Sequence, residues 1–91
     1  MTVATDRFEI VNERGLHARA SAKFVKLAQT FESEIGVSCN GDTVGGTSIM
    51  GLMMLAASKG CHVTIHCDGE DAETALIALG TLIADRFGEE I

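Results

Sequence analysis

The sequence predicts an α+β domain with the element order βαββαβα, in which helices cover one face of a sheet and leave the other face open. Two kinds of pattern support this prediction. Three short segments alternate apolar and polar residues, as strands with one buried face do, and two longer segments repeat apolar residues at helical spacing. The chain has 91 residues, so residues 1–91 are expected to form a single domain with one modest core.

The first strand is expected around Phe8, Ile10 and Asn12, which alternate with Arg7, Glu9 and Val11, and Gly15 interrupts the pattern. From residue 17 onward, apolar residues recur at helical spacing and predict an amphipathic helix of about three turns or slightly more. The apolar side of this helix consists of Ala20, Phe24, Leu27, Ala28 and Phe31.

A hairpin is expected next, because Asn40-Gly41 is a strong two-residue turn signal between two apolar segments. Its first strand has the alternating residues Ile35, Val37 and Cys39. Its second strand is short and passes through Thr43-Val44. Thr47 and Ser48 are good N-cap residues, and they predict a short helix over residues 49–56.

The last two elements are a strand and a long helix, which the turn Asp68-Gly69 separates. The strand has the alternating residues Cys61, Val63, Ile65 and Cys67. The helix has an apolar side formed by Ala72, Ala75, Leu76, Leu79, Ile83 and Phe87. Gly80 inside this helix costs roughly 1 kcal/mol relative to alanine, and Gly88 suits the end of the helix.

Charge and composition exclude several classes of protein. A net charge of −6 argues against nucleic-acid binding, because the phosphates would repel it. Residues 1–6 lack the pattern of a signal peptide, and the longest apolar run, residues 49–57, is too short to cross a bilayer. We therefore expect a cytoplasmic protein without membrane insertion. The three cysteines are expected to be reduced and largely buried, and His62 and His66 are expected to be solvated rather than to bind a metal.

The segment Gly15-Leu16-His17-Ala18-Arg19 carries the strongest functional signal. It places a histidine where a loop enters a helix, and an arginine in the first helical turn. Free backbone N–H groups and the positive end of the helix dipole lie there, which suits a ring nitrogen that carries a phosphoryl group. The N–H groups of Ala18 and Arg19 and the guanidinium of Arg19 are expected to supply positive charge to that group.

The segment 47–53 carries a second signal. Ser48 is expected to cap the short helix, a contribution of ~1 kcal/mol. This helix has more apolar residues than one buried stripe holds, so some of them should be exposed and suit a surface that docks protein partners. These residues are Ile49, Met50, Leu52, Met53, Met54 and Leu55.

Together, residues 12–19 (Asn-Glu-Arg-Gly-Leu-His-Ala-Arg) and residues 47–53 resemble the HPr family, the histidine phosphocarriers of the bacterial phosphotransferase system. The resemblance covers roughly residues 8–87. It implies a four-stranded antiparallel sheet with two longer helices on one face and a short helix beside the active centre. It also implies a phosphoryl carrier rather than an enzyme, with no cofactor and no metal.

The resemblance implies roles for individual residues of the first segment. It makes Nδ1 of His17 the phosphorylated atom and Arg19 the residue that assists it, while Arg14 is expected to be a solvated loop charge. The active-centre loop further includes Asn12, Gly15, Leu16 and Ala18. Where the family usually has a proline, this chain has Ala20, and we expect that change to affect the rigidity of the loop and the lifetime of the phosphohistidine more than the chemistry.

The second segment resembles the part of the family that contains a regulatory serine, which matches Ser48 and which a dedicated kinase/phosphorylase phosphorylates in some members. Ile49, Met50 and Met53 match a docking patch beside the histidine. The expected partners are enzyme I, charged by phosphoenolpyruvate, and an IIA-type acceptor, and the expected state is a monomer.

Two other functions stay open at this point. One is a purely regulatory binding module that Ser48 switches, and the other is a small enzyme with His17 as general base. The residues do not separate sugar uptake from the nitrogen-related branch, because the loop spacing resembles the latter and the serine segment resembles regulated members. Glu89 is interpreted as an ordinary surface charge.

Overall fold

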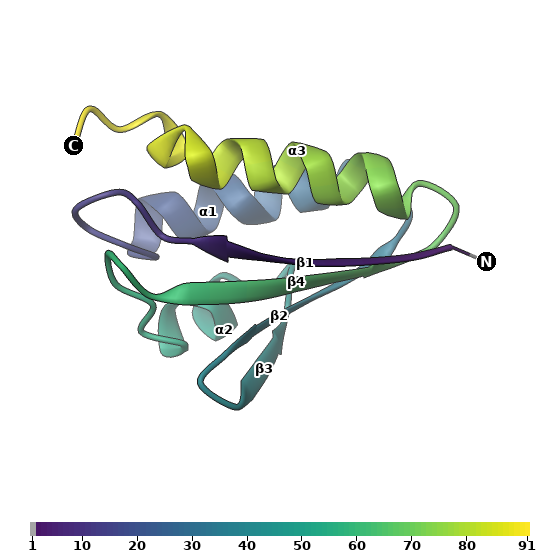
Figure 1. Ribbon diagram of the computed structural model, residues 1–91, viewed down its shortest axis with the longest axis horizontal. Coiled ribbons are helices and arrows are strands. Elements are labelled where there is room, and N and C mark those ends of the chain that lie inside the picture. Colours follow the sequence, from purple (N-terminus) through teal and green to yellow (C-terminus); the bar gives the residue numbers. More distant parts are fainter. Residues whose placement is uncertain (1) are drawn as a thin grey trace.

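A computed structural model describes residues 2–91 of the protein. In chain order its elements are β1 (Val3–Glu9), α1 (Ala18–Ala28), β2 (Glu34–Cys39), β3 (Asp42–Gly45), α2 (Ile49–Met54), β4 (His62–Asp68), α3 (Ala72–Ala84) and the 3₁₀ turn η1 (Arg86–Gly88). The predicted order βαββαβα is confirmed (Figure 1). Within the described residues, none of the helices has both the length and the apolar character that crossing a bilayer requires.

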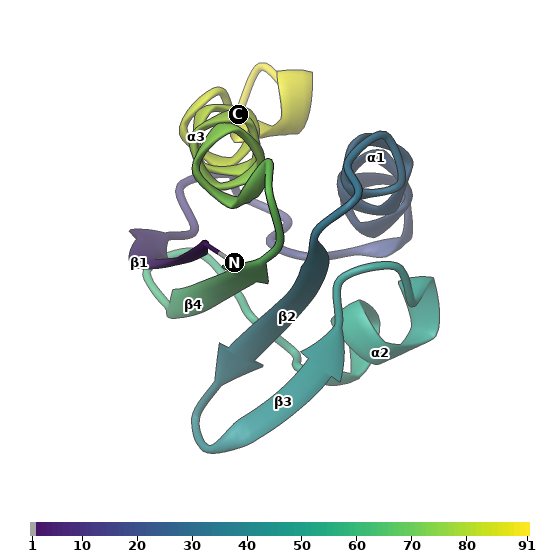
Figure 2. The same ribbon diagram turned by 90° about the vertical axis from the view of Figure 1, so that its right-hand side faces the viewer.

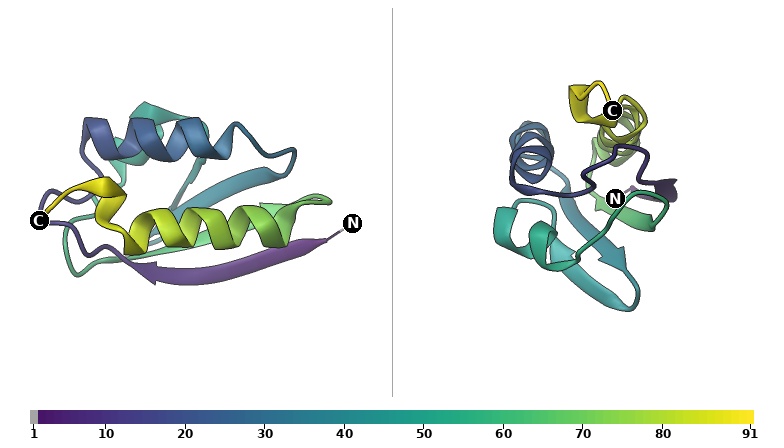
Figure 3. Two further views of the ribbon diagram at one scale, coloured as in Figure 1. Left: turned by 90° about the horizontal axis from the view of Figure 1, so that it is seen from above. Right: turned by 90° about the vertical axis from the view of Figure 1, so that its left-hand side faces the viewer.

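The four strands form one antiparallel sheet in the order β1-β4-β2-β3. Phe8 of β1 faces Val63 of β4, and Val37 of β2 faces Ile65 of β4. All three helices lie on the same face of this sheet, and the opposite face is open (Figure 2). Seen from above, α1 and α3 lie side by side and run in opposite directions (Figure 3). The α+β sandwich that the sequence predicts is therefore confirmed.

Strand β4 shows why the alternating pattern was informative. Val63 and Ile65 point into the core and are buried, whereas His62 and His66 alternate with them and are exposed on the open face. Cys67 also faces the core, and burial raises the pKa of its thiol. This strand lies at the centre of the sheet, so one of its faces is fully covered.

Gly80 allows α3 to approach the sheet closely. A Cβ atom at this position would lie 2.4 Å from Cε1 of Phe8, far inside van der Waals contact. A larger side chain at this position would push α3 away from β1. The close packing that Gly80 allows therefore compensates for the low helix propensity of glycine.

The bounds of β1 differ from those expected. The strand begins at Val3 and ends at Glu9, so Ile10 and Asn12 lie beyond it. Because β1 is an edge strand, only Ala4 and Phe8 are half-buried and its other residues are exposed. Too few of its side chains are buried to give the start of the strand a visible alternation.

The first two helices end before the last apolar residues expected in them, although α1 has the expected length of about three turns. Helix α1 ends at Ala28, before Phe31, and the hydroxyl of Thr30 donates a 2.7 Å hydrogen bond to a carbonyl of the last helical turn. Helix α2 ends at Met54 because Ala56 has a left-handed backbone, with φ of +53°, which cannot continue a right-handed helix. Both ends are thus set by local hydrogen bonding and backbone conformation, which the apolar spacing does not report.

Phe87 is buried as expected, but it does not belong to α3. Three consecutive residues, Arg86, Phe87 and Gly88, have left-handed backbones with φ of 56°, 54° and 78°. This turn reverses the chain after the helix and directs the ring of Phe87 into the core. Lys23 of α1 donates a 2.7 Å hydrogen bond to the carbonyl of Phe87, which fixes the turn from the neighbouring helix. Burial of the ring offsets the strain of two non-glycine residues in this conformation.

At the opposite end of α3, Asp71 connects the helix to the start of β2. Its carboxylate accepts hydrogen bonds from the backbone N–H groups of Glu32 and Ser33, at 2.8 and 2.9 Å, and from the hydroxyl of Ser33. These bonds, that of the hydroxyl above all, lower the pKa of Asp71.

Candidate functional site

The loop before α1 is pressed against the segment that follows α2, and Gly15 makes this approach possible. Its φ is +64°, and a Cβ atom on it would lie 2.3 Å from the carbonyl oxygen of Ala57. The N–H of Leu16 donates a 2.9 Å hydrogen bond to the same carbonyl oxygen. A residue with a side chain is therefore excluded at Gly15 both by backbone conformation and by space. The contact brings the two segments singled out in the sequence to one end of the molecule.

His17 is the N-cap residue of α1, with an extended backbone (φ −74°, ψ −178°). Its side chain makes no hydrogen bond to the helix, so it does not cap the first turn. Helix geometry leaves the first N–H groups of α1 without intrahelical partners. Ala18 and Arg19 are exposed, and within residues 2–91 no ion pair engages the guanidinium of Arg19. The start of α1 thus offers N–H groups and a positive charge to an anionic group.

The imidazole of His17 contacts Glu89 instead. Nε2 of His17 lies within hydrogen-bond distance of Oε2 of Glu89, and the two side chains are 23% and 13% exposed. This carboxylate comes from the segment after α3, 72 residues away in the chain. The interpretation of Glu89 as a surface charge was therefore wrong, since the side chain is turned inward onto the candidate histidine.

Asn12 holds the loop and this carboxylate together. It is fully buried, and its Nδ2 donates hydrogen bonds of 3.0 Å both to the carbonyl oxygen of Gly15 and to Oε1 of Glu89. The segment after η1, residues 89–91, is called here the tail. It is also attached through its backbone, because the N–H of Glu13 donates a 3.1 Å hydrogen bond to the carbonyl oxygen of Ile91. Asn12 thus links the loop before α1 to the carboxylate of Glu89.

The pKa of Glu89 is lowered although its largest single influence, burial, raises it. The hydrogen bonds from Asn12 and His17 and the electrostatic interactions with the His17 ring and with Arg14 outweigh burial, so the carboxylate is ionised at neutral pH. Arg14 itself is exposed in the loop, so its effect on this carboxylate is that of a nearby solvated charge.

Ser48 begins α2 in a way that contrasts with His17. Its backbone is extended (φ −109°, ψ 107°), and its Oγ accepts a 3.0 Å hydrogen bond from the N–H of Gly51. The residue is the N-cap of α2, while Thr47 lies one position outside the helix. Ser48 is exposed, so the hydroxyl is accessible at the same time as it caps the helix.

Helix α2 exposes a group of large apolar side chains, called here the apolar patch. Met50 and Met54 are 73% and 78% exposed, whereas Leu52 on the opposite side of the helix is fully buried. The patch consists of Ile49, Met50, Met53 and Met54. It lies on the helix next to α1 in the fold (Figure 2), on the same side of the sheet as the candidate histidine.

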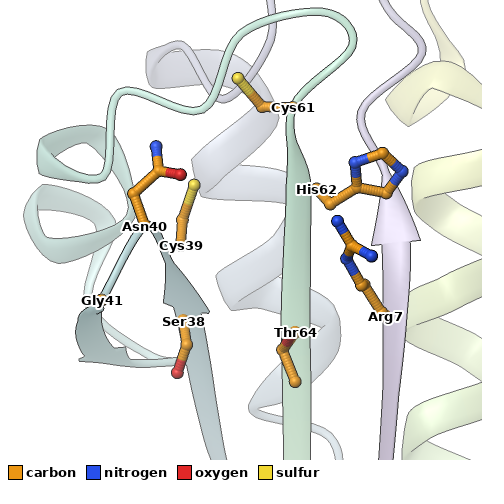
Figure 4. A pocket seen from close by; sticks show the side chains of 8 residues that line it. All are labelled: Arg7, Ser38, Cys39, Asn40, Gly41, Cys61, His62 and Thr64. Atoms are coloured by element: carbon orange, nitrogen blue, oxygen red, sulfur yellow. The ribbon is translucent and has the colours of Figure 1, made fainter.

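A shallow hollow of about 370 Å³ lies elsewhere, on the open face of the sheet. Figure 4 shows Arg7 of β1 beside His62 of β4 in this hollow, with Cys39 and Cys61 at its other side. Its lining is mostly polar and includes neither His17 nor Arg19. Within residues 2–91, no group of three or more histidine, cysteine or acidic side chains is arranged to hold a metal ion. Because the hollow holds neither of the residues singled out in the sequence, the start of α1 is the better candidate site.

The fold and the start of α1 define a small α+β protein that presents a histidine at a helix N-terminus open to an anionic group. Comparison with known proteins identifies the family to which such a protein belongs. The family model described as "PTS HPr component phosphorylation site" matches residues 4–85. The phosphocarrier protein HPr of Cupriavidus necator is 55% identical over 80 residues, which cover 88% of this chain and 90% of that protein. The corresponding protein of Neisseria meningitidis serogroup B is 53% identical over 81 residues, covering 89% and 91%.

A solved structure agrees with these relatives. The crystal structure of HPr-C-His from Thermoanaerobacter tengcongensis superimposes with a TM-score of 0.88 at 44% identity and covers 100% of both chains. The chain belongs to the HPr family, whose members are phosphocarrier proteins of the phosphotransferase system and not enzymes. The resemblance seen in the sequence is thereby confirmed.

Proposed function

We propose that this protein accepts a phosphoryl group from enzyme I on Nδ1 of His17 and passes it to an IIA-type protein. The observation that carries the proposal is the start of α1, where His17 leaves the helix uncapped and Arg19 is exposed beside it. An uncapped N-terminus is a ready-made anion site, because its N–H groups and dipole both favour negative charge.

The chemistry requires little more than positioning. The lone pair of a neutral imidazole attacks phosphorus, and the transition state spreads negative charge over the phosphoryl oxygens. The N–H groups at the start of α1 and the guanidinium of Arg19 stabilise that charge. A carrier only holds the phosphoryl group between its donor and its acceptor. The site therefore needs no catalytic group besides His17 and Arg19.

The decisive experiment is phosphorylation with phosphoenolpyruvate and enzyme I, followed by mass spectrometry. The protein should gain one acid-labile phosphate, whereas a regulatory module or a general-base enzyme would gain none. His17→Ala should gain none, and His62→Ala, on the open face of the sheet, should charge normally. Full incorporation into His17→Ala would overturn the assignment.

We also propose that the apolar patch docks enzyme I and the IIA acceptor in turn. Exposed methionines support this, because flexible apolar side chains adapt to several partners. The patch lies on the helix that packs beside α1, so a partner seated there would face the start of α1.

Ser48 is proposed as a regulatory phosphorylation site of a dedicated kinase. Its exposed hydroxyl lies at the edge of the apolar patch, so a phosphate there would have to be desolvated when a partner docks. At the start of a helix, the same phosphate should not harm the fold.

Two variants test this switch. Ser48→Asp should charge at His17 more slowly than wild type and melt at a similar temperature, and Ser48→Ala should charge normally. Wild-type charging of both Ser48→Asp and the phosphorylated protein would leave Ser48 as a helix cap only. Slow charging together with a much lower melting temperature would show unfolding instead of blocked docking.

The setting proposed for this function is the cytoplasm, with residues 1–91 acting as a single monomeric domain.

The identity of the acceptor decides whether the protein serves sugar uptake or the nitrogen-related branch of the phosphotransferase system. Incubating the charged protein with a sugar-specific and with a nitrogen-related IIA protein should show rapid transfer to one of them, and that acceptor decides between the two branches.

A further inference from the structure

The carboxylate of Glu89 contacts the ring nitrogen of His17 that the proposed transfer does not use. Its Oε2 lies within hydrogen-bond distance of Nε2 of His17, while its Oε1 accepts the hydrogen bond from Asn12. Both oxygens of the side chain are therefore engaged, one by the loop and one by the histidine.

The chemistry of the two groups decides which of them donates the hydrogen bond in this contact. An ionised carboxylate only accepts hydrogen bonds, so the ring nitrogen that faces it has to be the donor. A neutral imidazole has one N–H, and an acceptor placed at Nε2 draws the proton to that nitrogen. Nδ1 is then left with its lone pair, which is the form that a nucleophile at this atom requires.

The position of the carboxylate is built into the fold. The left-handed turn at Arg86–Gly88 reverses the chain, and burial of Phe87 anchors it two residues before Glu89. Beyond Glu89, the carbonyl of Ile91 accepts a hydrogen bond from the N–H of Glu13. The tail is thus held on both sides of the carboxylate, and Asn12 orients the carboxylate itself.

We propose that Glu89 is a positioning residue for phosphoryl transfer, which keeps the proton of His17 on Nε2 and so presents Nδ1 as the nucleophile. The inference rests on the proposed function, because it takes His17 as the phosphorylated residue. Its role continues after the transfer. When the Nδ1–P bond forms, the bond from phosphorus to the donor breaks and its electron pair leaves with the donor. Nε2 keeps its proton, so the ring becomes a phosphorylated imidazolium, and the carboxylate of Glu89 balances its positive charge.

The variant Glu89→Gln tests this role, because it keeps the shape of the side chain and changes its hydrogen bonding. Asn12 still donates to one side of the group and therefore holds the amide oxygen. The amide NH₂ then faces Nε2 and donates to it, which favours the tautomer with the proton on Nδ1. The control is Glu90→Gln, which removes the same charge from the exposed neighbouring residue.

Two measurements are made on each variant. The ¹⁵N chemical shifts of the His17 ring report the tautomer, and the initial rate of charging by enzyme I reports the reactivity of Nδ1. In Glu89→Gln we expect the proton to move towards Nδ1 and the charging rate to fall roughly tenfold or more, since charge-assisted hydrogen bonds are the strong ones. Glu90→Gln should match wild type in both measurements.

Each other outcome contradicts the proposal in a distinct way. Wild-type ring shifts and charging rate in Glu89→Gln would show that the carboxylate only anchors the tail. A slower rate with an unchanged tautomer, or an equal loss in Glu90→Gln, would attribute the effect to surface charge. Incorporation of phosphate into His17→Ala would instead show that the proposed function has failed, whatever Glu89 does. Melting temperatures of all forms identify any loss that comes from unfolding.

Discussion

Helices α1 and α2 both begin at a polar residue with an extended backbone, but only one of these residues caps its helix. Ser48 turns its hydroxyl back to the N–H of Gly51. His17 occupies the same position in α1 and turns its ring away, towards Glu89. The two helices contact each other, yet the start of one is closed by its own side chain and the start of the other is open.

The difference indicates where an anion is expected to bind. A missing N-cap hydrogen bond costs a helix ~1 kcal/mol, so an uncapped start is a disadvantage for the fold alone. It becomes useful when the N–H groups are needed by a ligand. The capped start of α2 is the reference, because there the N-cap side chain of the same protein supplies the hydrogen bond that is missing at α1.

The largest effect is expected at the loop that leads into the open helix start. Gly15→Ala should lower the free energy of unfolding by about 2 kcal/mol or more, because it combines a left-handed backbone with an overlap on the carbonyl of Ala57. Gly41→Ala is the matched control, since Gly41 also has a positive φ, of +87°, but open space around it. Equal losses in urea denaturation would show that space at Gly15 is unimportant.

A smaller effect is expected on the exposed side of the capped helix. Met50→Ala and Met53→Ala should each weaken binding to enzyme I by roughly tenfold or more, because central apolar anchors carry much of the energy of an interface. Glu90→Ala should leave the affinity unchanged, whereas Glu89 is unsuitable as a control because it contacts His17. Titration calorimetry measures the affinities, and equal losses at Met50 and Glu90 would place the interface elsewhere.

The comparison of the two helix starts can also be tested directly. His17→Ser should be more stable than His17→Ala by ~1 kcal/mol, because serine supplies the side-chain cap that α1 lacks. Ser48→Ala should lose a similar amount at α2. Thermal unfolding measures both differences. If serine and alanine at position 17 are equally stable, the start of α1 is closed to a cap for a reason other than the choice of residue.

The start of α3 gives the smallest effect, which depends on pH. Hydrogen bonds from the Ser33 hydroxyl and from backbone N–H groups lower the pKa of Asp71, so the unfolded chain binds the proton more readily than the folded one. The stabilisation is therefore present above the unfolded-state pKa and is lost as pH falls through the lower folded-state pKa. Asp71→Asn should flatten the decline of the melting temperature in that acidic range. Glu73→Gln, an exposed neighbour in α3, should keep the wild-type slope.

The sequence predicted most of the fold because most elements have one covered face. Strand β4 is central, and its alternation of Val63 and Ile65 with His62 and His66 is complete. The start of β1 could not be found in the same way, because an edge strand buries too little. Phe87 was correctly placed in the core but wrongly in a helix, since burial through a left-handed turn has no periodic signature.

For the site, the sequence predicted what lies within one segment. The pattern from Gly15 to Arg19 is local, so the histidine and the arginine were found without knowledge of the fold. Glu89 was missed because its contact spans 72 residues and its neighbourhood, two glutamates after a glycine, is typical of a solvated tail. The contact of Gly15 with Ala57 is equally non-local, although the glycine itself was a visible sign that the loop is constrained.

The attachment of the tail has a practical consequence for anyone who labels or immobilises this protein. The last described residues pass beside His17 and bond to its loop, whereas β1 begins at the opposite end of the molecule (Figure 1). A fluorophore, affinity peptide or surface linker joined after Ile91 would therefore crowd the histidine and compete with its partners. The same group joined ahead of β1 would lie the full length of the sheet away, and it is there that a reporter should be placed.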